Sequence, residues 1–194
     1  MNKKLGEAGE KSSSLIPPPS SLEDRVARVR LLLMDCDGVL TDGRITLLGG
    51  GEQKSFHTRD GHGIVLLHRA GLRTGVISGR TSAALDERAR ELGMHFVRQG
   101  TWDKVRDYEE VLAEAGVGGE EVGYVGDDVT DIPLMRRCGF AAAVADATPE
   151  TRAAAHYVTS LPGGAGAVRE VCELLLKAQG RWAELLERYT GDKG

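Results

Sequence analysis

The chain has 194 residues, of which 41% are hydrophobic and 28% charged, with a net charge of −4 and a pI of about 5.8. This length and composition are typical of one globular domain with a sizeable core. The acidic balance and the lack of a long basic run argue against nucleic acid as a partner. No apolar run approaches the ~18 residues that a membrane span needs, so no membrane contact is expected.

The three cysteines, Cys36, Cys138 and Cys172, give no even disulfide framework and no Cys-x-x-Cys spacing. This usage is typical of reduced thiols in a cytoplasmic protein. Lys3 and Lys4 are not followed by an apolar segment, so a secretory signal is not expected.

The predicted elements follow a polar start. Residues 1–21 carry runs of serine and proline and are predicted to be a disordered lead. One domain is expected over 22–180, and a C-terminal tail over 181–194. Strands are expected at 30–35, 45–48, 53–57, 74–77, 95–97, 122–125, 141–144 and 156–158, with 45–57 forming a β-hairpin around glycines. Helices are expected at 22–28, 61–70, 81–92, 103–115, 129–137 and 166–178, with a short one opening at Pro149.

Strands that alternate with such helices predict an α/β fold with a parallel sheet. In these sheets, ligands bind beyond the carboxyl ends of the strands. Small or acidic residues follow three of the predicted strands, namely Asp35 with Asp37, Ser78, and Asp127. This edge of the sheet is therefore the predicted functional site.

The first of these positions carries two acids. Residues 31–34 are apolar and run into Asp35 and Asp37, whose side chains point the same way if the strand continues. Two like charges repel unless a cation lies between them, and hard oxygen ligands suit Mg²⁺. The alternative is a strand end capped by turn-forming Asp and Gly.

Three further acids, Asp127, Asp128 and Asp131, follow the strand at 122–125. Together with the first pair they make five carboxylates, which would be costly at one edge without a cation. The alternative is that some of these acids, Asp128 and Asp131 above all, are helix N-caps.

Ser78 and Lys104 offer groups for a phosphoryl oxygen. Ser78 lies between a strand and a helix, where its hydroxyl and the nearby backbone N–H groups suit an anion. Lys104 lies near a helix N-terminus, where the dipole disfavours a cation, so a neighbouring phosphate and carboxylates would explain it. The alternatives are a plain N-cap serine and an isolated surface lysine.

These residues carry a resemblance to a known superfamily. The motifs Asp-x-Asp-Gly-Val-Leu-Thr-Asp-Gly at 35–43, Ser-Gly-Arg at 78–80, Lys104 and Gly-Asp-Asp-x-x-Asp at 126–131 occur in the order of the haloacid dehalogenase-like phosphatases. Residues 30–180 further resemble the small, capless 3-deoxy-D-manno-octulosonate 8-phosphate (Kdo 8-phosphate) phosphatases. The matching stretches are 56–64, 124–128, 144–147 and 163–172. The resemblance implies a Rossmann-like parallel sheet flanked by helices, with a β-hairpin in place of a cap domain.

The resemblance also implies a mechanism. Asp35 would attack phosphorus and form an aspartyl phosphate, and Asp37 would act first as acid and then as base. Mg²⁺ would be held by Asp35, the main-chain carbonyl of Asp37, and Asp127. Ser78 and Lys104 would bind the phosphoryl oxygens, and Asp131 or Asp128 would tether Lys104 or metal-bound water.

The implied substrate is an acidic keto-sugar phosphate. Arg80 and Arg88, eight residues apart, are expected on one face of one helix, and an arginine fork matches a carboxylate. The family also contacts sugar through the loop His57, Thr58, Arg59, Asp60 and Gly61. The alternative for Arg88 is a solvated helix face. Val65 stands where the family often has a basic residue, which departs from the pattern at one sugar contact.

Capless members are typically tetramers in which the hairpin, here near 44–57, closes a neighbour's active site, so a homotetramer is expected. Residues 163–166 resemble the start of a C-terminal tail that folds over substrate. Residues 181–189 are expected to be an amphipathic extension, with packing on its own subunit as the alternative.

Three other functions are alternatives for this pattern of residues. A phosphatase for a nine-carbon sugar acid phosphate would share the mechanism. A phospho-accepting signalling receiver also uses acids, a Ser/Thr and a Lys on a parallel sheet, but its phosphorylated Asp usually follows a middle strand. A non-catalytic binding subunit would not need the complete set of motif residues.

Overall fold

The computed structural model describes residues 21–49 and 51–191. Apart from Ser21, the predicted disordered lead therefore lies outside the described residues. Ser21 caps the first helix, α1 (Leu22–Ala27), because its hydroxyl oxygen accepts a hydrogen bond from the backbone N–H of Asp24.

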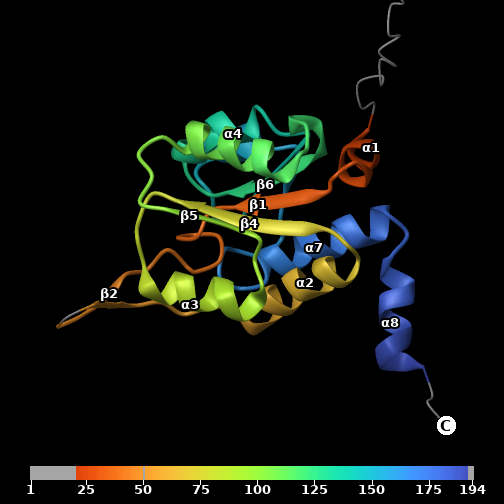
Figure 1. Cartoon of the computed structure of the whole chain (residues 1–194), viewed down its shortest axis with the longest axis horizontal. Helices are drawn as coiled ribbons and strands as arrows, with labels where there is room; N and C mark the ends of the chain where they lie inside the picture. The colour runs from red at the N-terminus through yellow and green to blue at the C-terminus, as the bar shows by residue number, and fades with distance from the viewer. Residues whose placement is uncertain (1–20, 50, 192–194) are drawn as a thin grey trace, which may run out of the picture.

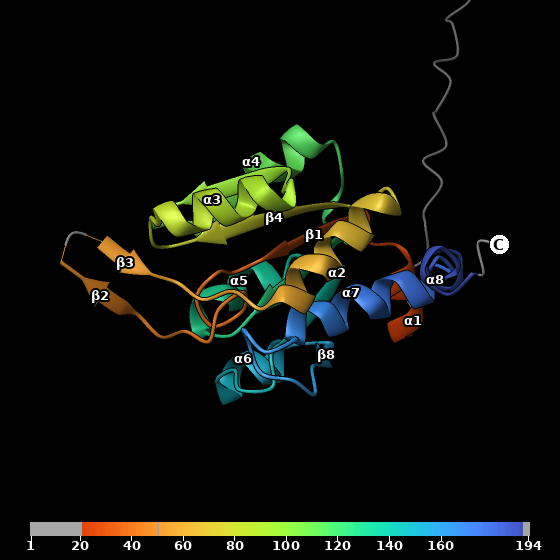
Figure 2. The same cartoon turned by 90° about the horizontal axis from the view of Figure 1, so that it is seen from below.

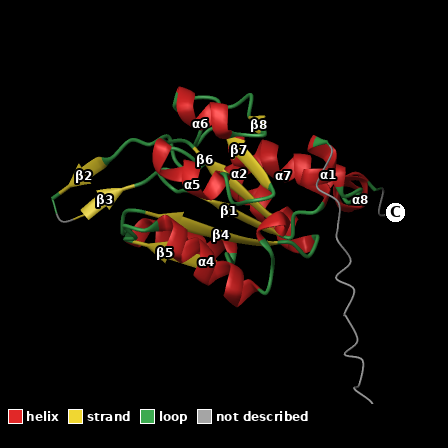
Figure 3. Cartoon of the chain, turned by 90° about the horizontal axis from the view of Figure 1, so that it is seen from above, coloured by secondary structure: helices red, strands yellow, loops and turns green. Residues whose placement is uncertain are grey.

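A six-stranded parallel sheet forms the centre of the molecule, in the order β5-β4-β1-β6-β7-β8 (Figure 3). Its strands are β1 (Leu31–Met34), β4 (Arg73–Ser78), β5 (Phe96–Gln99), β6 (Val122–Gly126), β7 (Phe140–Ala143) and β8 (Tyr157–Val158). Met34 lies opposite Val76 of β4 and Val125 of β6. The residues that follow these three neighbouring strands therefore leave the sheet at the same edge, as the sequence predicts.

Helices cover both faces of the sheet, with α4 on one face and α2, α3 and α7 on the other (Figure 1). Their bounds are α2 (Thr58–Arg69), α3 (Ala83–Leu92), α4 (Lys104–Ala115), α5 (Ile132–Met135), α6 (Pro149–Ala154), α7 (Ala167–Ala178) and α8 (Trp182–Thr190). Two 3₁₀ turns are η1 (Gly119–Glu121) and η2 (Val129–Asp131). Because of this cover, all four residues of β1 are fully buried, as expected for a central parallel strand.

Helix α2 begins at Thr58, three residues before the predicted start at 61. The family resemblance implied a loop from His57 to Gly61. In the structure Gly61 and Gly63 both lie within α2 and allow close packing, since a Cβ at Gly63 would lie 3.2 Å from the Cα of Arg169 in α7. The supposed sugar-contacting loop is thus an N-cap, His57, followed by the first turn of a helix.

Helix α3 begins at Ala83 with Ser82 as its N-cap, not at 81. Arg80 therefore lies before the helix, and the expectation that Arg80 and Arg88 share one helix face is wrong. The helix predicted at 129–137 is also shorter, because the turn η2 precedes a single turn of α-helix, α5.

The predicted hairpin is present as strands β2 (Thr46–Leu48) and β3 (Gly51–Gln53). Its second strand ends at 53, and residues 54–57 lead back to α2. The hairpin extends from one end of the molecule, and α8 lies at the opposite end (Figure 2).

The predicted C-terminal extension is helix α8, and it packs on its own chain. Leu185 is buried, and the ring of Trp182 lies beneath the charged groups of Arg169 and Lys177 of α7. The described residues thus favour the alternative that the extension completes its own subunit.

Candidate active site

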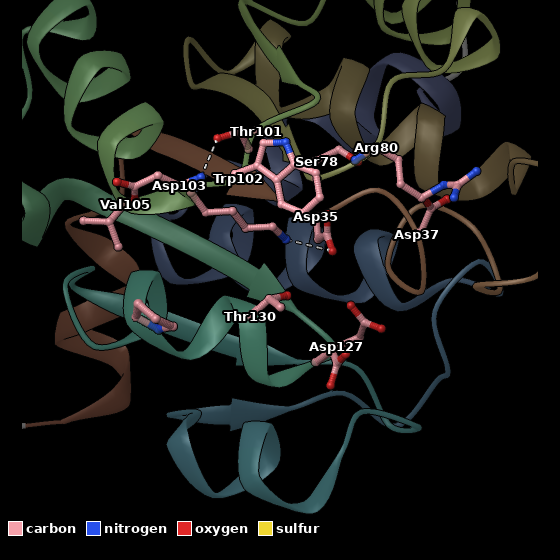
Figure 4. Close-up of a pocket in the computed structure, with 14 residues that line it drawn as sticks. Asp35, Asp37, Ser78, Arg80, Thr101, Trp102, Asp103, Val105, Asp127 and Thr130 are labelled. Atoms are coloured by element: carbon pink, nitrogen blue, oxygen red, sulfur yellow. Dashed lines mark hydrogen bonds and ion pairs between the residues drawn. The ribbon is translucent and has the colours of Figure 1, made fainter.

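Side chains from three adjacent strand ends line one cavity of about 560 Å³ (Figure 4). Asp35 directly follows β1, Ser78 is the last residue of β4, and Asp127 directly follows β6. Lys104, the first residue of α4, lines the same cavity. The structure therefore brings together the residues for which the sequence predicts catalytic and metal-binding roles.

A cluster of carboxylates lies at the bottom of this cavity. Asp35, Asp127 and Asp131 each offer one oxygen, and these oxygens lie within 4.8 Å of one another. Burial, and then the charge of Asp131, raise the pKa of Asp35 to about 6. Burial, and then the charges of Asp131 and Asp35, raise the pKa of Asp127 to about 8.

The donor set fits a divalent cation. Within the part of the chain that the structure describes, Asp127 Oδ1 is buried and has no hydrogen-bond partner. A buried carboxylate oxygen without a partner is costly unless it has a ligand. Hard oxygen donors from Asp35 and Asp127 are those that Mg²⁺ prefers. Gly38 lets the loop after β1 approach closely, because its φ is +89° and a Cβ there would overlap the carboxylate of Asp127.

Lys104 connects the cluster to α4. Its ammonium lies 3.0 Å from Asp35 Oδ2 and donates a hydrogen bond to Asp131 Oδ1 at 2.7 Å. Burial alone would lower the pKa of Lys104, but the charges of Asp131 and Asp35 raise it above its usual value. The lysine is therefore a buried ammonium beside Asp35, which suits a phosphoryl oxygen.

Asp131 is fully buried and accepts several hydrogen bonds. Besides Lys104, its donors are the Tyr124 hydroxyl at 2.8 Å and the backbone N–H groups of Asp127 at 3.0 Å and Asp128 at 3.4 Å. Asp128, by contrast, is exposed and caps η2 by accepting a hydrogen bond from the backbone N–H of Val129. Of the two acids, Asp131 is therefore the one that can tether Lys104. Asp128 is an N-cap, as the alternative interpretation expected.

Two cations, Lys54 and Arg80, lie beside the carboxylate of Asp37. Lys54, directly after β3, forms an ion pair with Asp37 Oδ1, and its side chain is only 2% exposed. Arg80 Nε lies 3.5 Å from Asp37 Oδ2. Glu52 joins the two cations, at 3.4 Å from Lys54 and 2.6 Å from Arg80. This four-residue ion-pair cluster connects the hairpin to the cavity.

Ser78 is buried at the end of β4, and it is not the N-cap of the following helix, since that role belongs to Ser82. Its Oγ accepts a hydrogen bond from the backbone N–H of Arg80 at 3.4 Å. The plain N-cap alternative for Ser78 is thus wrong.

The structure separates most of the expected sugar contacts from this cavity. His57 and Arg59 line a second cavity of about 520 Å³, next to Arg169. Asp60 is buried and accepts hydrogen bonds from the backbone N–H groups of Gly166 and Arg169, at 3.2 and 2.7 Å. Asp60 thus accepts hydrogen bonds from backbone N–H groups at the start of α7, which lies more than 100 residues away in sequence.

The other residues that were expected to contact sugar, Gly61, Arg88 and Thr58, also lie outside the main cavity. Gly61 packs against the guanidinium of Arg88, and Arg88 pairs with Glu91 at 2.7 Å and lies over the ring of Phe56. Thr58 is the first residue of α2. Of the predicted sugar-binding residues, Asp37, Arg80 and Lys104 line the main cavity.

Sequence reasoning missed Lys54 and Glu52. Both lie in or just after the second arm of the hairpin, and two opposite charges flanking Gln53 are a weak signal. Only the return of the hairpin toward β1 brings Lys54 to Asp37 and Glu52 to Lys54 and Arg80.

The strand order, the carboxylates after β1 and β6 and the buried lysine define a haloacid dehalogenase-like hydrolase. A family model described as haloacid dehalogenase-like hydrolase matches residues 93–168. The chain is also 44% identical, over 176 residues, to the 3-deoxy-D-manno-octulosonate 8-phosphate phosphatase KdsC of Yersinia pestis, covering 90% of this chain and 92% of the relative. The chain therefore belongs to the Kdo 8-phosphate phosphatase family.

Two solved structures agree with this assignment. The first is a 3-deoxy-D-manno-octulosonate 8-phosphate phosphatase from Moraxella catarrhalis in complex with magnesium, phosphate and KDO. It is 37% identical, with a TM-score of 0.85, and the match covers 87% of this chain and 98% of that one. The second is a cobalt-bound deoxy-D-mannose-octulosonate 8-phosphate phosphatase from Haemophilus influenzae, 39% identical with a TM-score of 0.79, covering 80% and 92%.

These comparisons place the chain among the phosphoric monoester hydrolases and confirm the predicted fold and enzyme class. The signalling-receiver alternative does not agree with them. None of the helices between residues 21 and 191 has both the length and the apolar character needed to span a bilayer.

Proposed function

We propose that this chain is a Mg²⁺-dependent phosphomonoesterase that hydrolyses Kdo 8-phosphate to Kdo and phosphate through an aspartyl phosphate on Asp35. The observation that carries the proposal is the placement of Asp35 between the ammonium of Lys104 and a carboxylate cluster, shared with Asp127, that would hold a cation. Attack by a carboxylate on a phosphate needs such neutralisation of charge.

In the first step, a carboxylate oxygen of Asp35 attacks phosphorus, and the bond between phosphorus and the sugar oxygen breaks. The carboxyl of Asp37 donates its proton to that leaving oxygen. In the second step, water attacks the phosphorus of the aspartyl phosphate, and Asp37 takes the proton of the water. Phosphate leaves, and both carboxyl groups return to their starting states.

Ser78 and Lys104 bind and orient the phosphoryl oxygens. Ser78 offers its hydroxyl from the strand end, and Lys104 acts as a point charge held by Asp131. Asp35, the main-chain carbonyl of Asp37, and Asp127 would hold the cation. Mg²⁺ bound there would screen the repulsion between carboxylate and phosphate and stabilise the charge of the transferring group.

For the sugar acid, Arg80 is the best-placed cation, because it lines the main cavity beside Asp37. Its planar fork suits a carboxylate. His57, Thr58, Arg59, Asp60, Gly61 and Arg88 remain predicted sugar contacts that this chain alone does not bring to the cavity. A related nine-carbon sugar acid phosphate is the second candidate substrate, since Val65 departs from the family pattern.

The assembly is proposed to be a homotetramer in the cytoplasm. The hairpin exposes Leu47 and Leu48, with 78% and 57% of their surface open, and these side chains suit a contact with another copy. A hairpin that closes a neighbour's cavity would help to exclude water from it.

The proposal is tested by phosphate release from Kdo 8-phosphate, the nine-carbon analogue and neutral sugar phosphates, with Mg²⁺ and with EDTA. Selective Mg²⁺-dependent release from Kdo 8-phosphate supports the proposal. Preference for the nine-carbon compound would retain the mechanism and change the substrate. Release from none of them would indicate a binding subunit and overturn the proposal.

A further inference from the structure

One large aromatic side chain at the main cavity has no covering. The side chain of Trp102 is fully exposed, at 102% of the reference area, although it lines the same cavity as Asp35 and Ser78 (Figure 4). The indole ring of tryptophan is a large apolar group. When it lies exposed to water, the protein does not obtain the favourable free energy that burial of this ring would give. Its place beside the reacting groups suggests that a ligand supplies the cover.

The position of Trp102 is fixed by its neighbours. The backbone N–H of Thr101 donates to the carbonyl of Ser78 at 3.4 Å, and the N–H of Asp103 donates to Thr101 Oγ1 at 3.2 Å. Asp103 in turn caps α4 by accepting a hydrogen bond from the N–H of Arg106 at 3.2 Å. Both flanking residues are thus anchored, one of them directly to the strand end that carries Ser78.

The chemistry around the ring defines what would cover it. Trp102 lies two residues before Lys104 in sequence, and Arg80 lines the same cavity with its side chain 47% exposed. The cavity therefore presents an aromatic surface together with cations, a combination that binding sites use to hold an apolar face and fix polar groups. A sugar acid offers both an apolar C–H face and negative charge.

We propose that Trp102 is a specificity-determining residue whose indole packs on the C–H face of the sugar acid while its phosphate lies at Asp35 and Lys104. This inference rests on the proposed function. It assigns the leaving-group side of the site to the loop that joins β5 to α4. An indole there favours substrates with an extended carbon chain over small phosphate esters that have no such face.

The test compares Trp102→Ala and Trp102→Phe with the wild-type enzyme on Kdo 8-phosphate and on acetyl phosphate, which has no sugar. The ratio of kcat/KM for Kdo 8-phosphate to that for acetyl phosphate should fall about 2- to 10-fold in Trp102→Ala. Trp102→Phe should recover most of the ratio. Trp182→Phe, in α8, serves as the matched control and should retain the wild-type ratio.

A fluorescence measurement tests the contact itself. The chain has two tryptophans, so Trp182→Phe leaves Trp102 as the sole emitter. Adding Kdo 8-phosphate to Trp182→Phe that also carries Asp35→Asn should shift the emission to shorter wavelength as the indole leaves water. Acetyl phosphate should produce no such shift.

The outcomes separate this inference from the proposed function. A wild-type enzyme that ignores Kdo 8-phosphate would overturn both. Wild-type turnover with an unchanged ratio in Trp102→Ala would overturn only the role of Trp102. A changed assembly mass of Trp102→Ala in sedimentation would show that the ring covers another copy of the chain and would also overturn it.

Discussion

The ammonium of Lys104 donates a hydrogen bond to Asp131 Oδ1 at 2.7 Å, and Asp131 is fully buried. The same ammonium lies 3.0 Å from Asp35 Oδ2. Asp131 thus fixes the lysine at the side of the proposed nucleophile. A buried carboxylate that orients a functional cation affects turnover without touching substrate.

Asp131→Asn should lower kcat/KM on Kdo 8-phosphate about 10- to 100-fold, because a neutral amide holds Lys104 less firmly. Steady-state phosphate release measures the effect. Glu150→Gln is the matched control, since Glu150 is an exposed acid in α6 that does not line the main cavity. Equal activities of Asp131→Asn and wild type would contradict the positioning role.

Lys54→Met should lower turnover about 10-fold or more, because it removes the buried one of the two cations that pair with both Asp37 and Glu52 and leaves only the half-exposed Arg80 between these acids. Arg44→Met is the control, since Arg44 is an exposed cation at the other arm of the hairpin and its side chain is 88% exposed. If the two variants showed the same rate, the hairpin would not act on Asp37.

Asp60→Ala should lower the free energy of unfolding by about 2 kcal/mol, because it removes two backbone hydrogen bonds at the start of α7. Urea denaturation measures the change. Asp42→Ala, at an exposed turn, should change stability by less than about 0.5 kcal/mol. A stable Asp60→Ala enzyme with a raised KM would instead support the sugar contact that the family resemblance implies.

The pKa of Asp127 predicts how pH affects the metal-free protein. The folded chain holds this carboxyl at a pKa of about 8, against 3.8 for a free side chain, so between these values the folded state binds the extra proton. The free energy of unfolding should therefore fall as pH rises through this window. Mg²⁺ needs the ionised carboxylate, so its binding should tighten over the same window.

Thermal unfolding in EDTA and in Mg²⁺ at about pH 6 and pH 8 tests this expectation. The Mg²⁺-dependent rise in Tm should be larger at the higher pH. Asp127→Asn should reduce both the rise and its pH dependence. A rise that is equal at both pH values in the wild type would argue against Asp127 as the titrating ligand.

The sequence was sufficient for the parallel sheet and for the edge at which the main cavity lies, because local patterns indicate both. Apolar runs followed by Asp35, Ser78 and Asp127 mark strand ends, and parallel strands bring their carboxyl ends to one edge. The contacts that were missed depend on distant parts of the chain. No local pattern shows that Lys54 returns to Asp37, or that Asp60 caps a helix that begins at residue 167.

Boundary errors had a different cause. The resemblance implied a loop that ends at Gly61, but Thr58, Arg59 and Asp60 are already helical, and Gly61 lets α2 lie close to α3. Ser82, rather than a residue before it, accepts the hydrogen bond from the N–H of Leu85 and so sets the start of α3. That shift of two residues places Arg80 three residues before the helix, so Arg80 does not share a helix face with Arg88.

A covalent phosphate on Asp35 is the central intermediate of the proposed mechanism. Enzyme that turns over Kdo 8-phosphate with Mg²⁺ is quenched in acid and reduced with borohydride, which converts an aspartyl phosphate to homoserine. Peptide mass spectrometry should find homoserine at position 35, only when substrate and Mg²⁺ are both present. Homoserine at another acid, or its absence during rapid Mg²⁺-dependent turnover, would contradict Asp35 as the nucleophile.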